Sequence, residues 1–238
     1  MDAKPALIFQ HGRLGPPAHV AEWLDERGLP FVVHHAGSDP PVAVGDFSCL
    51  VSLGSVESAA GGEPGWVPAE VAVLRAAVDA DVPVLGLCFG GQALSLALGG
   101  GVDRLARPEI GWFPLQVVDG GGVPEGPWLM WHNEQLRVPP GAVELARSPA
   151  GPAAFVCGPH LGVQFHPEVD AEVVQAWAEV DERLADLGLT PEDLAAQSEQ
   201  HAPAAREQAF AMFDWWLARA FSASDVERDR LTHAAHPQ

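Results

Sequence analysis

A cysteine at position 88 stands in the stretch VLGLCFGGQ (84–92), where an apolar run ends and glycines follow. The pattern G-x-C-x-G after a strand resembles a nucleophile elbow, a tight strand-to-helix turn that presents one side chain at the carboxyl edge of a sheet. The N-terminus of the following helix favours an anion, which makes a thiol there more reactive. Free cysteines are also among the most buried residue types, so a purely structural role for Cys88 is the alternative.

The stretch GVQFHPE (162–168) contains the groups that a thiolate nucleophile needs. His166 ends an apolar run and Pro167 favours an extended backbone, so the side chains of His166 and Glu168 are expected on the same side. A cysteine nucleophile requires a base, and the base requires a group that orients it. A single histidine at a strand end is usually structural, but this arrangement together with Cys88 indicates a Cys–His–Glu triad.

Apolar runs and helical periodicities alternate over the first hundred residues, and this alternation determines where Cys88 must lie. Strands are expected at 6–10, 31–36, 47–54 and 83–88, and helices at 17–28, 66–80 and 90–100. Strands that are apolar on both faces, with helices between them, predict a mostly parallel sheet covered by helices. The expected fold class is therefore a doubly wound, flavodoxin-like α/β fold.

The pattern changes after residue 100. Between 101 and 166 short apolar runs are separated by Gly/Pro turns, which predicts an antiparallel extension of the same domain. Helices are expected from about 170, at 171–188, 190–200 and 205–221. We predict one domain over 1–222 and a polar, mobile tail over 223–238.

Composition excludes several classes of function. The 238 residues carry a formal net charge of −19, which argues against nucleic-acid binding because phosphates are bound by clustered Lys and Arg. No apolar stretch is long enough to span a membrane, and no secretory signal is visible. Cys49 and Cys157 lie in apolar strands and are predicted to be buried. The three cysteines form neither a disulfide framework nor a metal motif, which indicates a reducing, cytoplasmic setting.

GLCFGGQ and GVQFHPE together resemble the class I (triad-type) glutamine amidotransferases, in particular free-standing proteins similar to the amidotransferase domain of GMP synthase. The resemblance covers roughly residues 5–185, with both motifs in the order and at a separation ordinary for the family. It implies that Cys88 is the nucleophile, His166 the general acid and base, and Glu168 the group that orients the histidine.

The resemblance also implies an oxyanion hole. VSLGS (51–55) stands where relatives often have S-G-G-P, so Gly54 matches the second glycine and Leu53 replaces the first. The expected donors are the backbone N–H groups of Gly54 and Phe89. The loss of the first glycine leaves the shape of this loop open.

The same resemblance implies residues that contact the substrate. Gln92 matches a position that contacts bound glutamine. The segment WLMWHNEQL (128–136) matches one that closes over the α-amino and α-carboxylate groups; its candidate contacts are Trp131, His132, Asn133 and Glu134. Asn133 replaces a glycine of relatives. Either it reshapes the pocket toward another γ-glutamyl compound, or Asn takes the left-handed conformation that Gly would take.

The function implied is hydrolysis of the γ-amide of glutamine through a γ-glutamyl thioester, with no metal or organic cofactor. No ATP-binding P-loop is visible, so ammonia would pass to a separate ATP-dependent synthetase subunit. A stand-alone γ-glutamyl amide hydrolase is the alternative, and a non-catalytic regulatory subunit is disfavoured because all three triad residues are present. The segment MFDWWLARAF (212–221) could dock a partner or pack on the core, and the second is expected.

Overall fold

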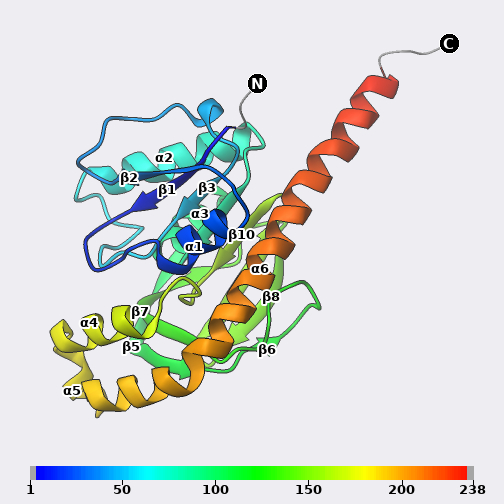
Figure 1. Ribbon diagram of the computed structural model, residues 1–238. Coiled ribbons are helices and arrows are strands. Elements are labelled where there is room, and N and C mark those ends of the chain that lie inside the picture. Colours follow the sequence, from blue (N-terminus) through cyan, green and yellow to red (C-terminus); the bar gives the residue numbers. More distant parts are fainter. Residues whose placement is uncertain (1–3, 235–238) are drawn as a thin grey trace.

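The computed structural model describes residues 4–234, with side chains through residue 222 (Figure 1). Within this range eight strands form one sheet of order β2-β1-β3-β4-β10-β9-β8-β6. These strands are β1 (Ala6–Gln10), β2 (Phe31–His35), β3 (Leu50–Ser52), β4 (Val84–Leu87), β6 (Gln116–Val117), β8 (Val143–Ser148), β9 (Gly151–Cys157) and β10 (His160–Val163). The helices are α1 (Ala18–Glu26), the 3-10 helix η1 (Val44–Asp46), α2 (Trp66–Asp79), α3 (Phe89–Ala97), α4 (Ala171–Val180), α5 (Arg183–Leu187) and α6 (Pro191–Ala234).

The sheet confirms the predicted α/β fold. Strands β2, β1, β3, β4 and β10 run parallel, and β10 pairs with β9 in the antiparallel sense, where β8 and β6 continue the extension. The antiparallel region differs in one respect. β5 (Gly101–Phe113) and β7 (Trp128–Arg137) leave the main sheet and form a separate antiparallel pair.

Hydrophobic side chains alternate between two cores, one on each face of the sheet. In β1, Ile8 packs in the core that holds residues of α1 and α6, whereas Leu7 packs in the core that holds residues of α2 and α3. This is the two-residue period of a strand that is covered on both faces. A third core joins α4 and α5 to the β5–β7 pair. The carboxyl ends of β3, β4 and β10 therefore meet between covered layers.

The C-terminal helices differ from the prediction. The expected helices at 190–200 and 205–221 are one continuous helix, α6, with Pro203 inside it. Thr190 caps its start, since its hydroxyl accepts a hydrogen bond from the Asp193 N–H at 3.1 Å. Pro203 removes only one backbone donor, and the buried side chains that follow, such as Phe213 and Trp216, hold the helix against the sheet. No helix in residues 4–234 has the length and hydropathy needed to cross a membrane.

The predicted tail, 223–238, begins within α6. The helix backbone continues to Ala234, past the sheet in Figure 1, and residues 235–238 lie outside the described residues, so mobility of the tail stays a prediction. The segment 212–221 packs mainly on the core, as expected, because Met212 and Trp216 are fully buried.

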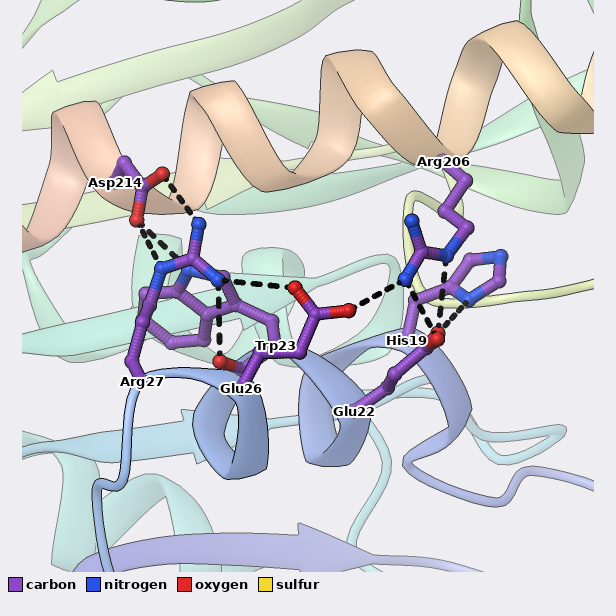
Figure 2. Close-up of polar contacts among 7 residues, drawn as sticks. All are labelled: His19, Glu22, Trp23, Glu26, Arg27, Arg206 and Asp214. Carbon is purple, nitrogen blue, oxygen red and sulfur yellow. Dashed lines mark hydrogen bonds and ion pairs between the residues drawn. The ribbon is translucent and has the colours of Figure 1, made fainter.

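A polar network ties α6 to α1 (Figure 2). Arg27 donates two hydrogen bonds to the carboxylate of Asp214, one of them at 2.6 Å. Arg206 donates to Glu22 at 2.6 Å and to Glu26 at 2.8 Å. The hydrogen bonds from Arg27 lower the pKa of Asp214, so this carboxyl is held in its charged form. The network links the exposed sides of α1 and α6, which are held together by the apolar core beneath.

Candidate active site

Cys88 lies in a tight turn between β4 and α3. Its backbone has φ 51° and ψ −104°, which is a strained conformation for a residue other than glycine. The turn requires glycine on both sides: a Cβ on Gly86 would lie 2.3 Å from the carbonyl oxygen of Gly90, and a Cβ on Gly90 would lie 2.0 Å from that of Ser52. The Cys88 N–H donates to the carbonyl of Val163 at 2.9 Å, which ties the turn to β10. This is the geometry of a nucleophile elbow.

His166 and Glu168 follow β10 and lie beside this turn. Both side chains are buried, and His166 Nδ1 is 2.8 Å from Glu168 Oε1. Burial alone would lower the pKa of His166. The negative charges of Cys88 and Glu168, with hydrogen bonds to both, outweigh burial and raise the pKa to about 10. The imidazole of His166 therefore holds its proton more tightly than a free histidine does.

Gly54 and Phe89, the two expected oxyanion-hole residues, lie beside Cys88 and His166. A Cβ on Gly54 would lie only 2.8 Å from His166 Cε1, so the Gly54 backbone is in direct contact with the imidazole. Phe89 is the first residue of α3, and its N–H has no acceptor within the helix. The Leu53 side chain is buried in the core beside α1.

Gln92 and Gln164 form a hydrogen-bonded pair beneath the cysteine. Gln92 Nε2 donates to the Glu134 carbonyl at 2.8 Å, and lies 3.4 Å from Gln164 Oε1. Gln164 Nε2 donates to Cys88 Sγ at 3.7 Å. The sequence reasoning missed Gln164. The signal was its position two residues before His166 in an extended segment, which puts both side chains on one face.

Residues 131–134 lie in β7, on one wall of the site. The Trp131 indole donates to Asp181 at 2.8 Å, His132 Nε2 lies 2.9 Å from Glu109 Oε2, and Glu134 forms an ion pair with Arg104 at 3.6 Å. Asn133 does not take the left-handed conformation, which was one of the two alternatives for this position. It lies within β7 between the paired residues His132 and Glu134, opposite the irregularity where the β5 register shifts between Arg104 and Glu109.

A cavity of about 580 Å³ opens beside Cys88 and His166. Of the ten predicted site residues, eight line it: Gly54, Cys88, Gln92, Trp131, His132, Asn133, Glu134 and His166. Phe89 and Glu168 are buried and do not line the cavity. Their expected roles need no such exposure: Phe89 would supply a backbone N–H, and Glu168 would orient His166.

Three other segments complete the cavity wall and were missed from the sequence. They are the loop after β1, the loop after β3, and the α4–α5 region, which contribute residues 11–15, 55–58, Trp177, Val180, Asp181 and Arg183. The indole of Trp177 packs edge-on against the His166 imidazole, with ring centroids 4.8 Å apart. A tryptophan in an amphipathic helix gives no local signal of such a contact, because it looks like an ordinary core residue.

Fold and site together define an α/β protein with a cysteine at a nucleophile elbow and a buried His–Glu pair beside it. Residues 58–176, half of the chain, match the family described as glutamine amidotransferase class-I. The chain is 34% identical over 142 residues to one of the subunits of GMP synthase (glutamine-hydrolyzing) from Ignicoccus hospitalis, an alignment that covers 55% of this chain and 71% of that one. The chain belongs to the class I glutamine amidotransferase family, a family of enzymes.

Two further relatives agree with this assignment. The chain is 40% identical over 108 residues to the GMP synthase (glutamine-hydrolyzing) of Aeropyrum pernix, but these residues are 40% of this chain and only 21% of that protein. The crystal structure of a glutamine amidotransferase from Methylobacillus flagellatus superposes with a TM-score of 0.85 at 28% identity, covering 91% of this chain and 95% of that one.

Proposed function

We propose that this chain hydrolyses the γ-amide of glutamine to glutamate and ammonia, with Cys88 as nucleophile, His166 as general acid and base, and Glu168 as the group that orients His166. The observation that carries the proposal is the geometry: Cys88 at a nucleophile elbow lines one cavity with His166, whose Nδ1 is 2.8 Å from the Glu168 carboxylate. Family membership supports the same reaction class.

The proposed reaction proceeds in two halves. The Cys88 thiolate attacks the carbonyl carbon of the γ-amide, and the oxyanion that forms accepts hydrogen bonds from the Gly54 and Phe89 N–H groups. His166 gives its proton to the leaving nitrogen, the C–N bond breaks, and ammonia and a γ-glutamyl thioester remain. His166 then takes a proton from water, which attacks the thioester and releases glutamate and the thiolate. These steps use no metal or organic cofactor.

The wall opposite Cys88 supplies the proposed substrate contacts. In this proposal Gln92 and the segment Trp131, His132, Asn133 and Glu134 surround the α-amino and α-carboxylate groups of the substrate. The carboxylate of Glu134 suits an ammonium group and the guanidinium of Arg104 suits a carboxylate, and both line the cavity. Since Gln92 is buried and bonded to the Glu134 carbonyl, it also holds this wall in place.

A separate ATP-dependent synthetase subunit is the proposed acceptor of ammonia. The support is the rim of the cavity, where three large hydrophobic side chains are exposed: Leu14 (49%), Val56 (100%) and Val180 (62%). Apolar side chains gathered at one opening are typical of a protein interface. The relative from Ignicoccus hospitalis is named as one subunit of its enzyme, which agrees with a two-chain arrangement.

A stand-alone hydrolase of γ-glutamyl amides or peptides is the second candidate. A cavity of about 580 Å³ lies within the ordinary range for sites that bind drug-sized ligands, so it can admit substrates larger than glutamine. A regulatory subunit without activity is disfavoured, because Cys88, His166 and Glu168 are brought together.

We also propose a cytoplasmic location. The proposed nucleophile must stay a free thiol, and a reducing compartment maintains it in that state. Cys49, Cys88 and Cys157 are all free in the structure.

Release of glutamate and ammonia from glutamine by the purified chain tests the proposal, with Cys88→Ala as control. Turnover that is lost in the variant would support a self-sufficient glutaminase. If glutamine is not hydrolysed but a γ-glutamyl peptide is, the second candidate replaces the first. If neither reacts alone, the assay is repeated with an ammonia-dependent synthetase, and failure there too rejects hydrolysis.

A further inference from the structure

A second histidine–glutamate pair lies beneath the Gly54 loop. His11, in the loop after β1, has its Nε2 2.7 Å from Glu70 Oε2 and its Nδ1 3.0 Å from the carbonyl oxygen of Gly54. The side chains of His11 and Glu70 are only 1% and 3% exposed. The imidazole therefore bridges a buried carboxylate and the loop that is proposed to hold the oxyanion.

The ring of His11 is fixed in orientation. It stacks on Trp66, with ring centroids 5.0 Å apart and an interplanar angle of 15°, and it contacts the ring of Phe89 at 4.7 Å. The other oxygen of Glu70 accepts a hydrogen bond from the Ser52 hydroxyl at 2.6 Å. Ser52 is the last residue of β3. The sheet therefore anchors the Glu70 carboxylate, and Glu70 in turn anchors His11.

The hydrogen-bond partners determine which nitrogen of His11 carries a proton. A carbonyl oxygen can only accept, so Nδ1 donates to Gly54. At Nε2 the shared proton lies between the ring and the Glu70 carboxyl group, whichever of them carries it. His11 has no partner to which it could pass the Nδ1 proton, which makes it a fixed donor and not a catalytic acid.

This donor orients one of the two peptide groups that flank Gly54. The preceding peptide is fixed because the Leu53 carbonyl accepts from the Gly90 N–H at 3.1 Å. The following peptide is fixed by His11 at the Gly54 carbonyl. The Gly54 N–H belongs to the preceding peptide, and the contact with His11 restricts rotation of the backbone on the other side of the Gly54 Cα. Glycine has no side chain to restrict its backbone, so the two contacts together fix the loop at Gly54.

We propose that His11, held by Glu70, is a positioning residue that fixes the peptide after Gly54 and so keeps the loop that carries the Gly54 N–H in place beside the reacting carbonyl. The inference rests on the proposed function, since it assigns a role within the same site. Removing one oxyanion donor costs ~10²–10³-fold in rate, so a misdirected donor should cost roughly 10–100-fold in kcat.

Two substitutions at position 11 separate the two hydrogen bonds of the imidazole. In His11→Asn the side-chain amide stands where Nδ1 was, so the donor to Gly54 is kept and the contact with Glu70 is lost. In His11→Gln the amide reaches Glu70 but leaves no donor at the Nδ1 position. The expected kcat for glutamine falls about 10–100-fold in His11→Gln and no more than about threefold in His11→Asn, with KM changed less than about threefold in both.

A second readout does not depend on glutamine as the substrate. Chloroacetone alkylates a thiolate with its carbonyl oxygen in the oxyanion hole, whereas iodoacetamide reacts by direct displacement and needs no such hole. Mass spectrometry of proteolytic peptides gives both alkylation rates at Cys88, separately from the free thiols of Cys49 and Cys157. The ratio of the chloroacetone rate to the iodoacetamide rate should fall at least tenfold in His11→Gln and stay within threefold of wild type in His11→Asn.

His160→Gln is the matched control, because His160 is a buried histidine at the opposite end of β10 from His166. It should leave the alkylation ratio and kcat within about twofold of wild type. If His11→Gln keeps the wild-type ratio, or if both His11 variants lose it equally together with a lowered Tm, the positioning role is rejected. If wild type fails to hydrolyse glutamine but the ratio behaves as expected, the proposed substrate is wrong and the positioning role stands.

Discussion

Two buried histidine–glutamate pairs lie on either side of Gly54. They differ in the group that the second ring nitrogen of the histidine contacts. His166 is 2.8 Å from Glu168, and its other partner is the Cys88 thiolate. His11 is 2.7 Å from Glu70, and its other partner is the Gly54 carbonyl. A thiolate can exchange a proton with an imidazole, but a carbonyl oxygen only accepts a hydrogen bond. The third partner, not the carboxylate, therefore separates the histidine that we propose to be catalytic from the one that we propose to hold backbone.

A third pair follows the pattern of His11. His132 lies 2.9 Å from Glu109 and 3.0 Å from the Glu134 carbonyl, so both of its nitrogens are engaged. Glu109 also accepts hydrogen bonds from Ser148 and from the Ala150 N–H. This pair joins β5, β7 and the turn after β8, and by the same argument it supports the wall of the cavity and moves no proton.

Loss of the catalytic pair should have the largest effect. His166→Asn keeps a side chain of similar polarity and removes the group that transfers protons, so glutamine turnover should fall about 10⁴-fold or more. Steady-state ammonia release checks this, with circular dichroism to show that the fold is kept. A loss of only 10–100-fold, as for His11→Gln, would break the distinction between the two pairs.

Gly54→Ala should have the next largest effect, because Gly54 lies beside both His166 and His11. An alanine Cβ would lie 2.8 Å from His166 Cε1, so the imidazole must shift away from Cys88. We expect kcat to fall about 10²-fold, by analogy with the loss of one oxyanion donor. Gly45→Ala, where a Cβ meets nothing within 4 Å, is the control and should keep full activity.

At the other carboxylate, Glu70→Ala should affect stability as well as activity. It leaves the buried Ser52 hydroxyl and His11 Nε2 without their partner, which costs about 1–3 kcal/mol in the free energy of unfolding. Activity should fall about tenfold. Glu70→Gln can still accept from Ser52 and donate to Nε2, so urea unfolding and kcat should both be closer to wild type. Equal losses in the two variants would mean that charge, not position, is what Glu70 supplies.

The pKa of His166 tests the charges around the catalytic pair. Removing the thiolate in Cys88→Ala takes away one of the two charges that raise the pKa, so the pKa should fall below about 10. Because the folded-state pKa is raised from 6.5, the bound proton stabilises the fold fully below about pH 6.5, and this contribution is lost as pH rises toward 10. NMR titration of the imidazole in both proteins measures the change, and an unchanged pKa would remove Cys88 as its cause.

The smallest effect is expected far from both pairs, in the network between α1 and α6. Arg206→Ala removes the contacts with Glu22 and Glu26 at a solvent-exposed site, where ion pairs contribute little. The Tm should fall by no more than about 3 °C, and kcat should stay within experimental error. A marked loss of kcat would show that the position of α6 affects the site.

Local patterns predicted the elements that position Cys88. The strand at 6–10 and the turn at Cys88 were visible because a short apolar run and a glycine-framed cysteine are signals carried by neighbouring residues. The separate pairing of β5 with β7 and the continuity of α6 through Pro203 were not predicted. Both depend on packing against parts of the chain that are far away in sequence.

The same difference applies to the histidine pairs. His166 and Glu168 are two residues apart, so an extended backbone alone brings their side chains together, and this contact could be predicted from neighbouring residues. His11 and Glu70 are 59 residues apart, and His132 and Glu109 are 23 apart. No local pattern predicts these two contacts. They depend on the folded chain, because the parallel sheet brings the loop after β1 against α2, and the β5–β7 pairing sets Glu109 opposite His132.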